Sequence, residues 1–340
     1  MRIIVILGFL LLFLSCVKDK KLLLANESEI LVLYCTFNPD STWELRLSST
    51  VSIGQYSQTF PKINGALVTL FENNILIDTF SNSSDGIYTS ALKPLVNKSY
   101  TVKVIADGFD KIEATDSLPI NNGNILVHEL QNQIIPKKLP PPSVDEVYYV
   151  APVNLSIEDK LSERNYYRIE SRARIKDASQ IPQEVLDNGL LHYEKETLIT
   201  DDDRFEPFNI DDAVICFKDV GLDGQTFNMR PYFVVGANVN DFLGKYTFFF
   251  EPNSLDYFDN GYNLIGRNYP TKIGGSDRWD LEYQVILKTI SKTYYEYTRS
   301  RMLQNYNRTI PGSQFNNVYS NVQGGKGIFA GFQIQVKALN

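Results

Sequence analysis

The spacing of apolar residues constrains the fold of this 340-residue chain more than any other feature. Apolar residues recur at a period of two far more often than at the 3.6-residue period of a helix, in short runs rich in Val, Ile, Thr, Tyr and Phe. Such alternation is typical of strands that bury one face. We predict a mainly antiparallel, all-β protein with strands over residues 30–37, 43–49, 66–72, 75–80, 87–92, 100–106, 111–118, 153–158, 166–175, 213–217, 226–235, 246–251, 281–290 and 328–337.

The first seven runs are spaced like the strands of an immunoglobulin-like sandwich. We therefore expect an N-terminal β-sandwich over residues 29–120 and a larger, sandwich-like β-rich domain over residues 144–340. Residues 121–143 between them contain the sequence PKKLPPP, whose prolines cannot donate ladder hydrogen bonds. This segment is predicted to be a linker, and the alternative is a proline-rich loop within one continuous sheet.

Local signals place turns and one helix within this pattern. Asn73-Asn74, Asp85-Gly86 and Asp223-Gly224 are turn residues that tolerate positive φ, and the last pair predicts a hairpin. Residues 291–306 lack Gly and Pro and begin at Ser291, a favourable N-cap, so they are predicted to be a helix. Its aromatic surface favours packing against a sheet over ligand recognition.

The N-terminus has the pattern of a secretory signal that ends at a cysteine. Arg2 precedes a twelve-residue apolar run, residues 3–14, which is too short to span a bilayer, and then come Ser15 and Cys16. Residues 13–16 (FLSC) resemble a bacterial lipobox, so residues 1–15 are predicted to be a signal peptide and Cys16 the acylated anchor in the lipid bilayer. The alternative is an ordinary signal with an incidental cysteine.

Residues 16–28 are expected to form a tether after the lipid. This charged segment resembles the region that follows the cysteine in lipoproteins of the outer membrane. We therefore expect a lipid-anchored outer-membrane protein, with its periplasmic or cell-surface orientation left open. A solvated linker without sorting information is an equal alternative.

The net charge limits the classes of partner, and the cysteine content limits the possible disulfides. The formal net charge of -7 argues against nucleic acid as a partner. Cys35 and Cys216 are the cysteines left after Cys16 is acylated, and both lie in apolar, strand-like runs. We predict two separate buried thiols, with a disulfide between them as the alternative.

Catalytic motifs are missing from the sequence. His128 and His192 are the two histidines, and neither belongs to a zinc-binding motif. The nucleophile-elbow pattern G-x-S-x-G does not occur. The two catalytic carboxylates of a glycosidase have no fixed spacing in sequence, so the sequence does not exclude this class of enzyme. No catalytic residue and no cofactor is predicted.

The acidic run Asp201, Asp202 and Asp203 is a weak candidate for binding Ca²⁺, because carboxylate oxygens suit that ion. The spacing is not that of an EF-hand, and a solvated loop is the favoured interpretation. Asp219 and Asp223 make a weaker case of the same kind, which a turn explains.

Ser41 and Ser117 follow aspartates in short motifs that resemble bacterial O-glycosylation sites, and they are candidate modification sites. Gly324, Gly325 and Gly327 surround a lysine near the C-terminus. They predict a tight turn before the last strand, since the phosphate-loop alternative lacks its motif and a following helix.

Three C-terminal segments resemble the lipoprotein family called domain of unknown function 4249 (DUF4249): LEYQV at 281–285, ISKTYYEY at 290–297 and VYSNVQGGKGIFAGF at 318–332. The resemblance extends to the lipobox and to residues 65–70, 165–168 and 201–205, and so covers nearly the whole chain. It implies an outer-membrane lipoprotein of Bacteroidetes-type bacteria, often associated with TonB-dependent receptors. It brings no established catalytic residue.

Two functions from different classes follow. The favoured one is a noncatalytic envelope lipoprotein, an accessory or ligand-binding partner of a TonB-dependent receptor in nutrient uptake, whose ligand is a small molecule, glycan or peptide. The alternative is a surface-anchored hydrolase acting on glycans or peptides, which needs a concave acidic site.

Overall fold

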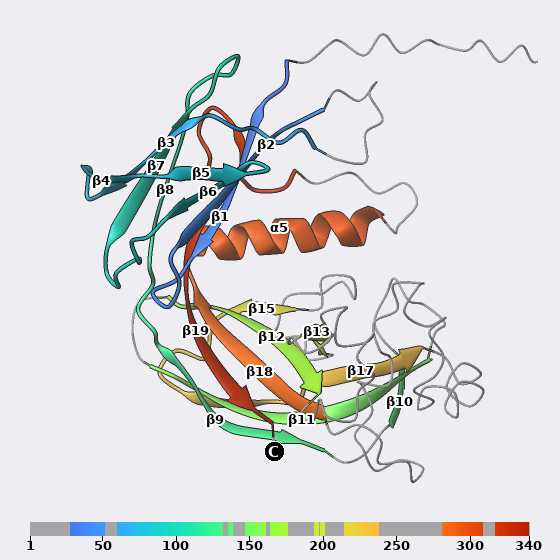
Figure 1. Ribbon diagram of the computed structural model, residues 1–340. Coiled ribbons are helices and arrows are strands. Elements are labelled where there is room, and N and C mark those ends of the chain that lie inside the picture. Colours follow the sequence, from blue (N-terminus) through green and yellow to red (C-terminus); the bar gives the residue numbers. More distant parts are fainter. Residues whose placement is uncertain are drawn as a thin grey trace, which may run out of the picture.

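A computed structural model of the chain describes residues 28–51, 60–131, 135–138, 147–160, 164–175, 194–196, 198–200, 214–237, 281–308 and 317–339. Strands in these ranges form three sheets, accompanied by the helix α5 (Lys292–Arg308) (Figure 1). The predicted all-β, sandwich-like fold is confirmed. No helix in these ranges has the length and apolar character needed to cross a membrane.

The first half of the molecule is a β-sandwich, formed mainly by the strands between Leu31 and Ser117, in which buried and outward-facing side chains alternate. A four-stranded sheet, in the order β4 (Ile75–Thr79), β3 (Leu67–Glu72), β7 (Ser99–Ile105), β8 (Ile112–Ser117), packs on part of a nine-stranded sheet. The facing strands are β1 (Leu31–Phe37), β2 (Trp43–Ser49), β6 (Ile87–Ser90) and β5 (Ser81–Ser84). Every second side chain of β1 and β2 is buried in this core, as the alternation predicts.

The same nine-stranded sheet continues into the second half. Beyond β1 it runs through β19 (Lys326–Ala338), β18 (Leu281–Ile290), β12 (Tyr166–Ile175) and β13 (Glu194–Glu196), with β15 (Ile215–Lys218) paired to β12. β19 is parallel to β1 and antiparallel to β18. The last strand of the chain therefore joins the two halves by continuous hydrogen bonding.

A six-stranded sheet covers one face of this second half. Its strands are β9 (Gly123–Leu130), β10 (Ile135–Lys138), β11 (Val147–Asp159), β14 (Leu198–Ile199), β16 (Thr226–Met229) and β17 (Tyr232–Ala237). Aromatic rings connect the two sheets: Phe217 contacts Tyr167 within the large sheet and Phe227 across the core.

The segment expected to be a linker, residues 121–143, contains two of these strands. β9 pairs with β11 over seven residue pairs, and β10 pairs with the beginning of the same strand. Pro136 fits into β10 because this strand lies at the end of its sheet, where a missing N–H leaves no bond unmade. The division at residues 120 and 144 stays a prediction, but the segment between them is paired β structure where described.

The helix α5 packs on β19, β18, β12 and β15 and begins as predicted. The hydroxyl of Ser291 accepts a hydrogen bond from the Tyr294 N–H at 3.1 Å, which is N-cap geometry. Tyr294, Tyr295 and Met302 are buried against Ile328 and Phe332 of β19. The aromatic surface of the helix thus serves packing, as expected.

β19 supplies side chains to both cores. Phe329 packs in the first sandwich with Phe37 and Trp43, whereas Ile328 and Ala330 face α5 in the second core. This alternation follows the two-residue period of the sequence.

The turn predictions are largely confirmed. Asn73 and Asn74 have φ values of 47° and 69° and connect β3 to β4, the geometry of a two-residue hairpin turn. Asp85 and Gly86 do the same between β5 and β6. The prediction for Asp223 is wrong in part, because the turn links β15 to β16, which lie in different sheets and form no hairpin.

Two further comparisons with the sequence concern the second half. The predicted strand over 226–235 is divided into β16 and β17 at Pro231, which interrupts the ladder. The predicted strand over 246–251 lies outside the described residues. Cys35 and Cys216 are both buried and no disulfide joins them, so the prediction of two separate buried thiols is confirmed.

Candidate functional site

Several predicted site residues fall outside the part of the chain that the structure describes. These are Cys16, Asp201, Asp202 and Asp203. Ser41 and Ser117 are both described and both exposed, the first in the turn before β2 and the second at the end of β8. Their exposure leaves them accessible, and their glycosylation stays a prediction.

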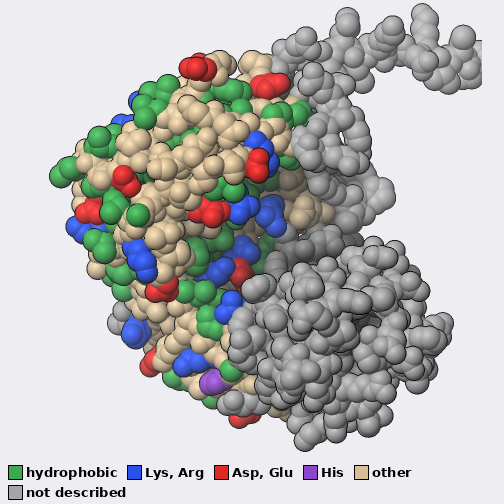
Figure 2. All heavy atoms as spheres, viewed as in Figure 1, with side chains coloured by type: hydrophobic (Ala, Val, Ile, Leu, Met, Phe, Trp, Pro, Cys, Tyr) green, Lys and Arg blue, Asp and Glu red, His purple; other side chains and the backbone are tan. Residues whose placement is uncertain are grey.

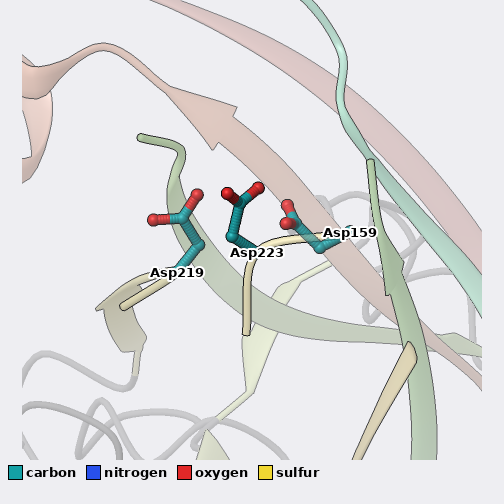
Figure 3. A group of neighbouring side chains, drawn as sticks. All are labelled: Asp159, Asp219 and Asp223. Atoms are coloured by element: carbon teal, nitrogen blue, oxygen red, sulfur yellow. The ribbon is translucent and has the colours of Figure 1, made fainter. Parts of the chain in front are cut away.

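Three other carboxylates meet where the two sheets of the second half approach each other. Asp159 ends β11, while Asp219 and Asp223 belong to the turn after β15, and their ligand oxygens lie within 4.8 Å of one another. Figure 3 shows the three carboxylates on the same side of this turn. Asp159 and Asp219 are almost fully buried, and Asp223 is exposed.

Donors from the surrounding backbone and side chains already hold this acidic group. One oxygen of Asp159 accepts from the Tyr167 hydroxyl and from the Asn165 amide at 3.1 Å, and the other accepts from the Gly224 N–H at 2.9 Å. Asp219 accepts from the Asn165 N–H at 2.7 Å. These bonds connect β11, β12 and the turn, so the arrangement is a polar core junction whose oxygens could also ligate a hard cation.

The electrostatics of the group reflect its crowding. Burial raises the pKa of the Asp219 carboxyl, and the charges of Asp159 and Asp223 raise it further, against the opposing Asn165 N–H. Sequence reasoning had noticed Asp219 and Asp223 but missed Asp159, because strand pairing brings it there from 60 residues away and no local pattern signals it.

A groove of about 530 Å³ lies beside the beginning of α5. Asp116 lines this groove, where it accepts from the Ser291 hydroxyl at 2.5 Å and from the Gly331 N–H at 3.0 Å. Burial raises the pKa of Asp116, and these donors oppose the rise. Arg164, Asn165 and Lys292 also line the groove. Because Asp116 occupies the positive end of the helix, a second anion there is disfavoured.

A second polar cluster lies on the face of β12 and β18 that α5 covers. We call Arg168, Glu170 and Lys288 the basic cluster. Glu170 pairs with both cations, and its carboxylate oxygens lie 2.9 and 3.0 Å from the Lys288 ammonium. Burial opposes ionisation of Glu170, but Arg168 and Lys288 outweigh it and lower its pKa to about 2. The three side chains are each 13–16% exposed.

An apolar surface marks the outer edge of the first sandwich. Ile75, Leu76 and Ile77 of β4 are 69%, 54% and 37% exposed. We call these three residues the β4 edge. β4 ends its sheet, and Figure 2 shows hydrophobic side chains along this side of the molecule. Exposed apolar edges of this kind are typical of protein contacts.

Comparison with known proteins identifies one family. The sequence profile of the Domain of unknown function (DUF4249) matches residues 20–338, nearly the whole chain. The chain belongs to the DUF4249 family. No curated protein matches the sequence.

In this DUF4249 chain the described residues of the C-terminal motif have a structural role. The Asn321 amide donates to the Phe329 carbonyl at 2.8 Å and accepts from its N–H at 3.0 Å, pairing with β19 as a neighbouring strand would. Gly324 and Gly327 have φ values of 75° and 113°. A Cβ at Gly327 would lie 1.8 Å from the Leu33 carbonyl oxygen, so this position requires glycine. The predicted tight turn is thereby confirmed.

Proposed function

We propose that this protein is a noncatalytic, lipid-anchored outer-membrane protein that serves as an accessory partner of a TonB-dependent receptor in nutrient uptake. The observation that carries the proposal is the β4 edge, which exposes three consecutive large aliphatic side chains on the last strand of its sheet. Such a surface favours contact with another protein over contact with water.

The sequence before β1 supports the membrane location. The lipobox at residues 13–16 provides a site for acylation at Cys16, and several acyl chains hold a protein on a membrane almost permanently. Residues 17–30 separate Cys16 from β1, and a chain of this length spans at most roughly 50 Å. The first sandwich therefore stays within reach of proteins in the same membrane.

The kind of contact follows from the position of the strand. β4 is the last strand of its sheet, so an extended segment of the partner can pair with it by main-chain hydrogen bonds. The exposed Leu76 and Ile77 then pack against apolar side chains of that segment. A receptor held in the same membrane meets this edge at high effective concentration.

Affinity purification of the tagged, full-length protein from mildly solubilised outer membranes tests the proposal. Leu76→Lys places a charge on the β4 edge, and Leu126→Lys is the matched control, since Leu126 is 46% exposed on β9. We expect a TonB-dependent receptor to co-purify stoichiometrically with wild type and Leu126→Lys, and at least ten-fold less with Leu76→Lys. Cys16→Ala should also weaken recovery. Equal recovery with both lysine variants, or no receptor with any, would contradict the proposal and make a hydrolase screen the next step.

A further inference from the structure

The basic cluster carries more positive than negative charge in a place with little water. Arg168 and Lys288 lie directly opposite each other on β12 and β18. Glu170, two residues along β12, is the carboxylate that the described residues provide to both. With side chains only 13–16% exposed, the three groups hold one net positive charge. Such a charge is costly to bury unless an anion compensates it.

Besides Glu170, the two cations contact described neighbours that carry no negative charge. Arg168 donates to the Thr298 hydroxyl of α5 at 3.2 Å and lies 5.5 Å from the centre of the Tyr294 ring. The Lys288 ammonium lies 5.0 Å from the centre of the Phe332 ring. Aromatic faces attract cations weakly compared with a carboxylate or phosphate, so these contacts orient the charges without neutralising them.

A tyrosine of the first sandwich faces the same side of the large sheet as the basic cluster. Tyr34 of β1 is 42% exposed, and it points away from the sandwich core toward α5, since its strand neighbours Leu33 and Cys35 are buried on the other face. Burial raises the pKa of Tyr34 and Tyr294 raises it further, while the charges of Arg168 and Arg301 lower it, so the Tyr34 hydroxyl lies within electrostatic range of both arginines. Figure 2 shows Lys and Arg side chains, with Asp and Glu side chains among them, between the two halves of the molecule.

We propose that the basic cluster binds an oxyanion, the carboxylate or phosphate group of a small ligand, with Tyr34 donating a hydrogen bond at the entrance. Guanidinium and ammonium groups on adjacent strands suit oxygens of one anionic group, and the arginine offers planar donors where the lysine acts as a point charge. Binding would complete the charge balance of the site. This proposal goes beyond the receptor partnership and concerns a different surface from the β4 edge.

Thermal unfolding of the full-length protein in non-ionic detergent tests the proposal. The probes are inorganic phosphate and acetate, each compared with sodium chloride at equal ionic strength, and the comparison of the two probes distinguishes phosphate from carboxylate recognition. We expect at least one probe to raise the unfolding temperature of wild type above the chloride value. Lys288→Met should weaken this response at least ten-fold, because it removes one of the two cations but keeps the Arg168–Glu170 pair.

Two further variants complete the design. Lys103→Met is the matched control, since Lys103 also lies on a strand over an aromatic ring and beside a carboxylate, Glu113, but in the first sandwich. It should respond like wild type. Tyr34→Phe removes only a hydroxyl group from a partly exposed side chain, so we expect this variant to fold. It should weaken the stabilisation by the anion several-fold. This variant tests the proposal if Lys288→Met does not fold. No stabilisation of wild type beyond chloride, or an undiminished response in Lys288→Met and Tyr34→Phe, would overturn the proposal.

Discussion

Among the described glycines, Gly327 leaves the least room for a side chain. Its φ of 113° and the Leu33 carbonyl oxygen, 1.8 Å from a would-be Cβ, both exclude other residues. Gly327→Ala should therefore lower the free energy of unfolding by about 3 kcal/mol or more, because β1 and β19 must separate to make room. Gly108→Ala is the control: Gly108 has a φ of 82° but open space, so only backbone strain of about 1 kcal/mol is expected. Equal losses in urea unfolding would show that the close approach does not matter.

Glu170 should make the stability depend on pH. Its folded-state pKa is lowered from an ordinary 4.5 to about 2, chiefly by Arg168 and Lys288 acting against burial. The stabilisation is thus complete above pH 4.5 and is lost as the pH falls toward 2. Glu170→Gln should cost about 3 kcal/mol at pH 7, since two buried cations lose their counter-charge.

Urea unfolding of wild type and Glu170→Gln between pH 7 and pH 3 measures this difference. We expect the gap between the two proteins to narrow steadily below pH 5. A gap that stays constant across this range would mean that the carboxylate is not specifically stabilised in the folded protein.

Residues governed by local geometry could be predicted, and those brought together by strand pairing could not. Ser291 and Gly327 were identified from capping and turn preferences, which act over a few positions. Asp159 and the Arg168–Lys288 pair were missed, because their neighbours lie 60 and 120 residues away along the chain. Only the register of paired strands determines such contacts.

The helix α5 is held at its N-terminus by a residue of the first sandwich. Asp116 on β8 accepts from the Ser291 hydroxyl, which itself caps the helix. Ser291→Ala should cost about 1 kcal/mol. In a double-mutant cycle with Asp116→Ala, we expect a coupling energy of about 1 kcal/mol, because the two side chains form one hydrogen-bonded unit. Ser291→Ala with Asp107→Ala, an exposed control, should be additive. Additivity in both cycles would refute the link.

Strand positions followed from alternation, and β2, β12 and β18 match their predicted bounds. The pattern failed where two physical effects compete. The prolines in residues 121–143 led to the prediction of a linker, but β10 is an edge strand and accommodates Pro136. Alternation also continued through Pro231, where the ladder breaks. No local pattern indicates which sheet a strand joins. The turn at Asp223 was therefore predicted to form a hairpin, although it connects strands of two different sheets.

Cooperative unfolding of the two halves of the molecule depends on β19. Because this strand pairs with β1 and β18 and fills both cores, the two halves should unfold together. Phe329→Ala, which empties part of the first core, should lower the stability of both halves by about 3 kcal/mol or more. Hydrogen exchange of β2 and β18 amides provides the measurement. A loss confined to β2 would mean that the halves unfold independently.

The function proposed above requires that the β4 edge meet a receptor in the outer membrane. Photo-crosslinking in living cells can examine this contact, with a photoreactive amino acid at Leu76 and, as the control, at Leu126. We predict an adduct with a TonB-dependent receptor from position 76, much less from position 126, and its loss when Cys16 is replaced by alanine. Adducts of equal strength from both positions, or none from position 76, would contradict the account.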